Sequence, residues 1–264
     1  MGGYEATHGV AAAGVSGQVT QVKCTYCYRE GIWTKGRIPS RRILDLIDEI
    51  GDNNGLVLIF SGGEPLLDPA VPEYLRRCRD RRVFPQISTN GHRLTTTLID
   101  KLAEIQIPYL QISIDSVDRD VFKAMTGVDG VEVVKTAIKQ AVRAGLKIVM
   151  RSVMCKTNAN QVQSLIDFAE NSGVVRLDMS PIEISATSPA HQYALRLTHA
   201  DVLRINADIE DYKGELSVHF GGGSRIIKLA RSSVKTFGPS GVSGPRKLLG
   251  AGATAARKVA KEKL

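Results

Sequence analysis

The stretch LIFSGGEPLL, residues 58–67, joins a buried-strand pattern to a tight polar turn. The apolar run that ends at Phe60 is typical of a strand covered on both faces. Gly62 and Gly63 then allow the backbone to turn sharply and to approach a ligand without a Cβ in the way. We expect the Glu64 carboxylate to point into a cleft at the strand end, where it can pair with an ammonium group. Taken alone, this turn is equally compatible with a simple connection after a strand.

The chain on either side of this turn alternates short apolar runs with amphipathic helical stretches. We expect strands at 56–60, 85–89, 109–115, 146–154 and 174–181, and helices at 39–55, 71–82, 95–105, 130–145, 158–173 and 198–212. Ser40 and Thr198 are expected to cap helices, Asn158 to start one and Gly173 to end it. Such alternation predicts an α/β fold with a parallel sheet, helices outside it, and ligands at the carboxyl ends of the strands.

The two ends of the chain fit this pattern poorly. Residues 1–22 should supply a first strand, but they are rich in Gly and Ala and alternate only weakly in VSGQVTQV. Residues 214–264 are biased toward Gly, Ala, Ser and Arg, and the part from Arg225 onward has a net charge of +9, which exceeds the +8 of the whole chain. We therefore expect an atypical N-terminal segment at 1–22, a core at 23–213, and a basic, low-complexity, poorly ordered tail at 214–264.

Composition restricts the class of protein. With 264 residues and 43% apolar residues, the chain can bury a substantial core. Its four cysteines are too few and too scattered for a disulfide framework, so a Cys-x-x-Cys pair indicates metal or redox chemistry in a reducing compartment. No apolar run approaches the roughly 18 to 20 residues that span a bilayer, and the N-terminus lacks a signal-peptide pattern. We expect a soluble, cytoplasmic protein with no membrane partner.

Cys24 and Cys27 form that pair, with the aromatic residue Tyr26 between them. Two thiolates at this spacing can hold a metal but cannot complete a site alone. At this point the chain resembles the radical S-adenosylmethionine (radical SAM) enzymes, through five stretches in the same order: KCTYCY, LIFSGGEPLL, ISTNG, LQISIDS and MRSVMCKTNANQ. The resemblance covers residues 23–212, and SGGEP downstream of the cysteine pair is its most specific part.

The resemblance implies a partial (β/α)6 barrel, open on one side, with a [4Fe–4S] cluster and S-adenosylmethionine (SAM) as cofactors. Such enzymes bind the cluster through three cysteine thiolates and leave one iron open for the amino and carboxylate groups of SAM. An electron from the cluster then cleaves SAM to a 5′-deoxyadenosyl radical, which abstracts hydrogen from a substrate.

The resemblance also assigns roles to particular residues. Cys24 and Cys27 match the second and third cluster ligands, and Tyr26 matches the aromatic residue near the cluster and the adenine. The other matches are the turn that holds the SAM amino group (Gly62, Gly63, Glu64, Pro65), the end of the third strand (Ser88, Asn90), the ribose side (Ser113, Asp115), and a basic group that could meet the SAM carboxylate (Arg151). For the last five residues, a packing or capping role is an equal alternative.

Position 20 departs from the family pattern. The spacing Cys-x-x-x-Cys-x-x-Cys places the first ligand at Thr20, and a neutral hydroxyl is a poor substitute for a thiolate on iron. The chain has either kept the fold and lost the radical chemistry, or completes the site with another thiol such as Cys155 or an external one. The third explanation is that the residues before Val22 are not the family's own N-terminus. We favour the third, because the weak first-strand pattern occurs in the same segment, and we expect another reading frame of the coding DNA to contain the missing cysteine codon.

The other cysteines and the histidines carry less weight. Cys78 is expected to be a partly buried structural thiol in a helix, whereas Cys155 could face the cleft from the end of the fifth strand. His92, His191 and His199 are not clustered, and we expect them at the surface or in caps rather than as ligands.

The leading interpretation is radical SAM chemistry on a peptide or a cofactor precursor, with a small-molecule substrate equally open. The same resemblance implies a reductant protein such as flavodoxin or ferredoxin as partner. The alternative is a degenerate relative without a stable cluster that binds SAM or a partner. The basic tail leaves contact with nucleic acid or an acidic partner as a further option, but a solvated extension is the simpler interpretation and nucleic acid is not an expected partner.

Overall fold

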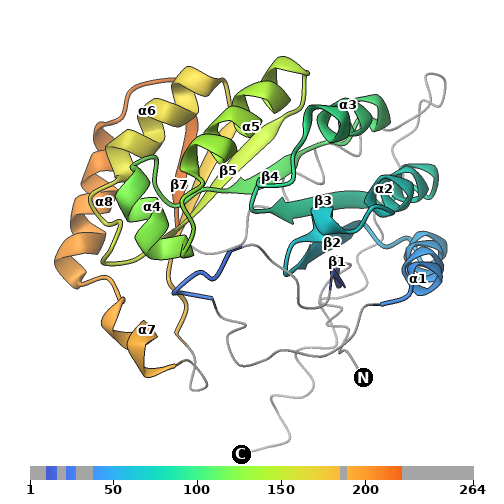
Figure 1. Cartoon of the computed structure of the whole chain (residues 1–264), viewed down its shortest axis with the longest axis horizontal. Helices are drawn as coiled ribbons and strands as arrows, with labels where there is room; N and C mark the ends of the chain where they lie inside the picture. Colours follow the sequence, from blue (N-terminus) through green and yellow to red (C-terminus); the bar gives the residue numbers. More distant parts are fainter. Residues whose placement is uncertain (1–9, 17–21, 28–37, 185–188, 222–264) are drawn as a thin grey trace, which may run out of the picture.

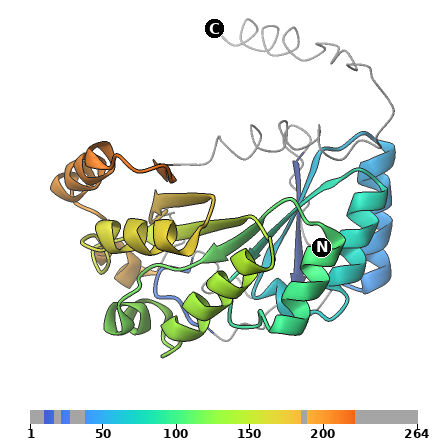
Figure 2. The ribbon, with the colours of Figure 1, turned by 90° about the horizontal axis from the view of Figure 1, so that it is seen from above.

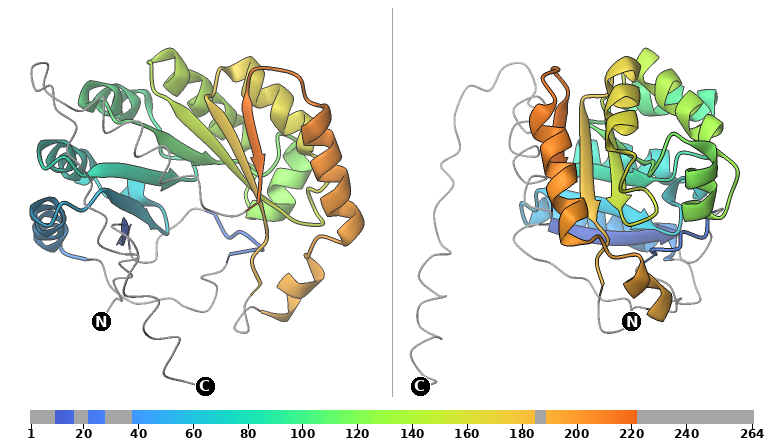
Figure 3. Two further views of the ribbon diagram at one scale, coloured as in Figure 1. Left: turned by 180° about the vertical axis from the view of Figure 1, so that it is seen from behind. Right: turned by 90° about the vertical axis from the view of Figure 1, so that its left-hand side faces the viewer.

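The computed structural model describes residues 10–16, 22–27, 38–184 and 189–221, the first of these ranges as backbone only. Within these residues the chain forms one sheet of parallel strands whose order in space follows the order in sequence (Figure 1). The strands are β1 (Val10–Ser16), β2 (Val57–Gly62), β3 (Phe84–Thr89), β4 (Leu110–Ser113), β5 (Ile148–Met154), β6 (Arg176–Pro181) and β7 (Ser217–Phe220). β1 and β7 lie at opposite edges of the curved sheet (Figure 3). The prediction of a partial barrel is confirmed, because the described strands pair only with their neighbours and leave the sheet open.

Helices connect successive strands and cover the outer side of the sheet (Figures 1 and 2). This arrangement follows from parallel pairing. Each strand starts at the same end of the sheet, so a crossover must return the chain to that end before the next strand begins. The helices are α1 (Ser40–Asp52), α2 (Val71–Asp80), α3 (Thr96–Ile105), α4 (Arg119–Thr126), α5 (Val131–Arg143), α6 (Val162–Ser172), α7 (Ala190–Ala194) and α8 (His199–Asp211), and a 3₁₀ turn, η1, spans Pro65–Leu67.

Side-chain alternation along the strands separates the core from the inner face of the sheet. In β5, Ile148 and Met150 are fully buried in the core beneath the helices, whereas Arg151 lines a cavity on the other face. Burying a side chain such as Ile148 contributes about 1.5–3 kcal/mol. The outer face of the sheet therefore stabilises the fold, and the inner face is left for polar residues.

Two of the predicted helix boundaries are confirmed. Thr198 caps α8 in a reciprocal arrangement with Asp201, and Gly173 ends α6 in the left-handed region with φ 72°.

The predictions at Ser40 and Asn158 are wrong. Ser40 is the first residue of α1, and Pro39 holds the cap position without a side-chain hydrogen bond. α6 begins at Val162, four residues after Asn158. The Asn158 amide is buried instead against the ends of two strands, where it donates to the carbonyls of Asp115 and Val153 and accepts from the Cys155 amide. Asparagine side chains commonly bond to nearby backbone groups in this way. Here the Asn158 side chain bonds to the backbone at the strand ends and does not cap the helix.

The sheet extends past both expected boundaries of the core. β1 pairs with β2, so the first strand lies earlier than the weak alternation at 15–22. β7 pairs with β6, which adds a strand from the segment that we assigned to the tail. Thr20 and the basic residues after Gly221 lie outside the described residues. In the described ranges, no helix has the length and apolar character needed to cross a bilayer.

Candidate active site

A cavity of about 860 Å³ opens at the carboxyl ends of β2 to β6, on the inner side of the sheet. This volume is in the range of sites that enclose a small molecule or cofactor. Of the twelve site residues expected from the sequence, the structure places ten on the cavity wall: Cys24, Tyr26, Cys27, Gly62, Gly63, Ser88, Asn90, Ser113, Asp115 and Arg151. Glu64 and Pro65 are the two that do not line the cavity. The sequence therefore predicted the place of the cavity, and the role of each residue stays a prediction.

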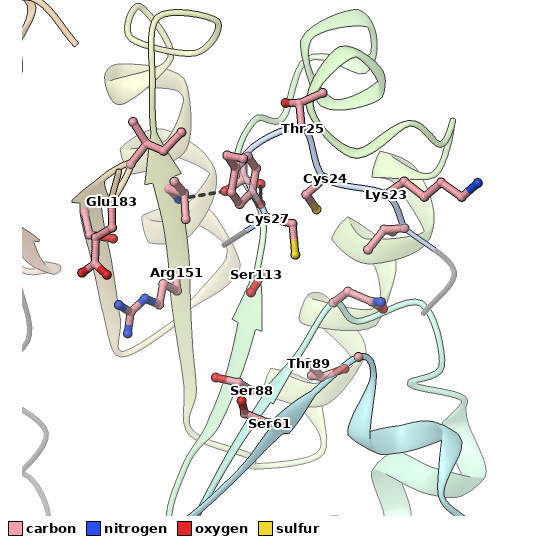
Figure 4. Close-up of a pocket in the computed structure, with 18 of the residues that line it drawn as sticks. Lys23, Cys24, Thr25, Cys27, Ser61, Ser88, Thr89, Ser113, Arg151 and Glu183 are labelled. Carbon is pink, nitrogen blue, oxygen red and sulfur yellow. Dashed lines mark hydrogen bonds between the residues drawn. The ribbon is translucent and has the colours of Figure 1, made fainter. Parts of the chain in front are cut away.

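The two cysteines sit on a tight turn at one end of the cavity, with both side chains drawn toward it in Figure 4. The Cys27 amide donates to the Cys24 carbonyl at 3.1 Å, which closes the turn. On one side of the turn, the amide of Thr25 donates to the Met125 carbonyl at the end of α4. The amide of Lys23 donates in the same way to the Thr126 carbonyl. These backbone bonds hold the thiols against the strand ends although the turn belongs to no helix or strand.

Tyr26 connects this turn to the end of β4. Its hydroxyl donates to the carboxylate of Asp115, which is 2% exposed and also accepts from the Val153 amide at 2.8 Å. Burial raises the pKa of Asp115 to about 6, and these two hydrogen bonds oppose the rise. Burial also raises the pKa of Tyr26, and the nearby Asp115 charge adds to this rise. The same two causes, in the same order, raise the pKa of the Cys24 thiol to about 12. Asp115 is thus committed to protein partners, and the neighbouring Ser113 hydroxyl stands on the cavity wall.

Glu64 does not point into the cavity, which corrects our expectation. Its side chain is fully buried and accepts three hydrogen bonds: from the Leu66 amide at 3.0 Å, the Thr89 hydroxyl at 2.7 Å and the Asn90 amide at 2.8 Å. Burial raises the pKa of Glu64, and these three bonds oppose that rise. The carboxylate therefore ties the end of β2 to the end of β3. The backbone of the two glycines that precede Glu64 lines the cavity instead. Of these, Gly62 has φ 135°, a conformation that favours glycine.

Ser88 takes part in a chain of polar side chains across the inner face. The Gln86 amide donates to the Gln111 side-chain oxygen at 3.2 Å, and the Gln111 amide donates to the Ser88 hydroxyl oxygen. The Ser88 proton is therefore left to donate toward the cavity (Figure 4). Sequence reasoning missed Gln111, although its alternation with the buried Leu110 and Ile112 was a usable signal.

Arg151 is the basic residue on the cavity wall contributed by β5 (Figure 4). Within the described ranges its guanidinium forms no ion pair or side-chain hydrogen bond, although Asp178 stands beside it on β6. The Asp178 carboxylate pairs instead with Arg176 at 2.8 Å. An arginine on a cavity wall whose guanidinium meets no partner in the described part of the chain can bind an anionic group of a ligand.

The remaining cysteines behave in two ways. Cys78 is fully buried in the core and not partly buried as expected, and its position there is compatible with a structural thiol. Cys155 is also fully buried, in a small cluster with Met125 and Ile182, and does not line the cavity. The suggestion that Cys155 faces the cleft as a substitute ligand is therefore wrong.

His191 is exposed, as predicted, but it also belongs to the cavity wall, which the sequence did not indicate. It lies on α7, lines the cavity, and its Nε2 lies 3.0 Å from the Thr25 carbonyl oxygen. His92 is half-buried next to Asn90, and His199 is the exposed first residue of α8. Gln192, which no sequence pattern indicated, donates to the Cys27 carbonyl at 3.1 Å.

The donor atoms fit the implied cofactors in part. The cavity size, the glycine backbone and Arg151 suit a zwitterionic ligand such as SAM. Cys24 and Cys27 supply two soft ligands suited to iron. In the part of the chain that the structure describes, no three His, Cys, Asp or Glu side chains gather as a complete metal site. Position 20, where the resemblance places the first cluster ligand, is not among those residues.

Curated relatives include enzymes of cofactor and peptide modification. A probable GTP 3′,8-cyclase of Sulfurisphaera tokodaii is 30% identical over 163 residues, which cover 61% of this chain and 52% of that protein. An Fe-coproporphyrin III synthase of Methanosarcina barkeri is 26% identical over 160 residues, 59% of this chain and 40% of the relative. A PqqA peptide cyclase of Granulibacter bethesdensis is 23% identical over 202 residues, 74% of this chain and 53% of the relative. The chain thus spans about half the length of these relatives.

Solved structures share the fold. Streptococcus suis SuiB bound to the precursor peptide SuiA superposes with a TM-score of 0.71 at 18% identity, over 84% of this chain and 50% of SuiB. The protein anSMEcpe, solved with bound AdoMet and a Kp18Cys peptide, superposes with a TM-score of 0.69 at 15% identity, over 79% of this chain and 63% of that one. At such identities the likeness shows the fold alone.

A family model connects the fold and the motifs. The model of the radical SAM superfamily, whose members use a [4Fe–4S] cluster and SAM, matches residues 19–169. That match covers the cysteine turn, the SGGEP turn and the strands β2 to β5 that carry most of the cavity wall. This chain belongs to the radical SAM superfamily.

Proposed function

We propose that this chain binds SAM in the described cavity and carries a [4Fe–4S] cluster on Cys24 and Cys27, for radical chemistry on a peptide or a cofactor precursor. The observation that carries the proposal is the meeting of three features in one cavity: the cysteine turn, the backbone of Gly62 and Gly63, and Arg151. When bound, the reduced cluster supplies the electron that cleaves SAM and starts hydrogen abstraction from the substrate.

The chain's own residues would bind and orient SAM. The backbone of Gly62 and Gly63 would receive the amino group, and the guanidinium of Arg151 would pair with the carboxylate. The Ser113 hydroxyl is the candidate for the ribose, because the neighbouring Asp115 carboxylate is already bonded to Tyr26 and Val153. Asn90 would line the same side, and its backbone amide donates to the Glu64 carboxylate.

The substrate class is proposed from the relatives. PqqA peptide cyclase and the complex of SuiB with SuiA favour a peptide as substrate. The probable GTP 3′,8-cyclase and the Fe-coproporphyrin III synthase favour a cofactor precursor. We propose a reductant protein such as flavodoxin or ferredoxin as electron donor. A cytoplasmic location follows from the need to keep the thiols reduced.

A second function has one observation in its favour. Only two thiols line the cavity among the described residues, and Thr20 supplies no thiolate. A chain that binds SAM or a partner without holding a cluster would account for this.

Binding and cleavage of SAM separate the two functions. Calorimetric titration of SAM into the full chain is expected to show binding that Arg151→Gln weakens by about tenfold, the loss of one charged contact. The matched control Arg143→Gln, at the exposed end of α5, should bind like the wild type. Formation of 5′-deoxyadenosine by the reconstituted, reduced protein supports the enzyme. Binding without cleavage supports the second function, and no SAM binding at all contradicts both.

A further inference from the structure

The short helix α7 reaches the cysteine turn from the side opposite to α4. In Figure 1 the described segment 22–27 passes between these two helices. On the α4 side, the turn donates two backbone amides to the end of that helix. On the α7 side, the turn presents carbonyl groups, which only accept hydrogen bonds.

Two adjacent residues of α7 meet these carbonyls. Gln192 is fully buried, and its side-chain amide donates to the Cys27 carbonyl at 3.1 Å. The Nε2 of His191 lies 3.0 Å from the Thr25 carbonyl oxygen, and because a carbonyl cannot donate, this nitrogen carries the proton. The two contacts join residues about 165 positions apart in the sequence, so they tie together distant parts of the chain.

α7 is itself anchored to the sheet. The Leu195 carbonyl at its end accepts from the Lys156 amide, directly after β5. The Leu195 side chain packs on the cluster of Met125, Cys155 and Ile182, against which Tyr26 also packs. These contacts join the end of α7 to the chain after β5 and to the cluster on which Tyr26 packs.

α7 and the residues that follow β6 also form part of the cavity wall. Ile182 and Glu183, which follow β6, line the cavity together with His191. His191 therefore both contacts the cysteine turn and lines the cavity.

We propose that α7 positions the cysteine turn, with Gln192 and His191 as positioning residues that fix the carbonyls of Cys27 and Thr25. That this positioning helps the turn to hold iron rests on the proposed function. That α7 orders the turn does not depend on the proposed function. Once both amides and carbonyls are held, the backbone that carries the two thiols is ordered before any cofactor arrives, which reduces the entropic cost of binding.

Hydrogen exchange of the full chain, kept free of iron, tests this inference. Gln192→Met keeps the size of the side chain and removes the donor, and His191→Leu removes the other donor at an exposed site. Each is expected to speed exchange of the Thr25 and Cys27 amides about threefold to tenfold, the effect of one net hydrogen bond on a local opening. His191→Gln retains a donor and should exchange like the wild type. Gln163→Leu, an exposed position on α6, is the matched control for the loss of a glutamine.

The amides of α2 report on global opening in the same experiment. The inference holds if exchange rises in the cysteine turn and stays constant in α2. It is overturned if the turn is unchanged, if α2 accelerates equally, or if His191→Gln behaves like His191→Leu. Because the samples contain neither iron nor SAM, failure here would leave the proposed function standing, and failure of SAM binding would leave this inference standing.

Discussion

Tyr26 and Asp115 lie 89 residues apart in the sequence, and the hydroxyl of the first donates to the buried carboxylate of the second. This bond joins the cysteine turn to the end of β4, and Asp115 in turn accepts from the amide of Val153 on β5. The turn that carries the thiols is thereby fixed to the central strands of the sheet.

Removal of the Tyr26 hydroxyl should destabilise the protein. In Tyr26→Phe the Asp115 carboxylate keeps only the Val153 amide, and a buried charged acceptor that loses a donor costs about 1–3 kcal/mol. Urea unfolding at neutral pH measures this loss. Tyr109→Phe is the control, since the described contacts of Tyr109 are made by its ring, with Phe84 and Lys147. Equal stability of the two variants would show that the bond contributes nothing to folding.

Glu64 distinguishes a structural carboxylate from a ligand-binding one. In Glu64→Gln, one of the three donors now facing the side chain must meet an NH₂ group, so we expect a loss of about 1–3 kcal/mol in the free energy of unfolding. Glu73→Gln on the exposed face of α2 should change stability little. A variant of unchanged stability that loses SAM affinity would restore the role in which Glu64 pairs directly with the ammonium group.

His92 makes stability depend on pH with a definite sign. Its pKa is lowered from 6.5 by burial, and its Nε2 is buried without a hydrogen-bond partner among the described residues. The unfolded chain therefore takes up a proton before the folded one as pH falls through 6.5, and the folded state loses stability. Between about pH 7.5 and pH 5, the wild type should lose more unfolding free energy than His92→Gln. The exposed His199→Gln should follow the wild type; if His92→Gln does so too, His92 is not the source of the effect.

Most strands and helices of the core were predictable from the sequence because they have a local signal, whereas α4 was not predicted. The alternation in β5 places Arg151 opposite to Ile148 and Met150, and the run before Gly62 identifies a buried strand. The site was predictable for a related reason, since the carboxyl ends of parallel strands converge on one edge of the sheet. Motif order then pointed to the ten residues that the structure gathers on the cavity wall.

The parts that sequence reasoning missed depend on contacts between distant residues. α7 has five residues, too few for a periodic pattern, and Gln192 meets Cys27 across 165 positions. Glu64 does not point into the cavity because three donors, one from η1 and two from the end of β3, surround its carboxylate, which no local pattern reveals. β7 has four residues, none of them fully buried, and it lies in a segment whose composition suggested a tail.

Restoring a thiol at position 20 tests the radical SAM proposal most directly. Wild type, Thr20→Cys and Thr97→Cys, which adds a thiol on the exposed face of α3, would be reconstituted with iron and sulfide without oxygen. Bound iron and 5′-deoxyadenosine would then be measured after reduction with SAM. We expect Thr20→Cys to retain about four iron ions per chain and to form 5′-deoxyadenosine, with less iron in the wild type and in Thr97→Cys. Failure of Thr20→Cys to retain iron, or no 5′-deoxyadenosine from it, would contradict a radical SAM site in this cavity.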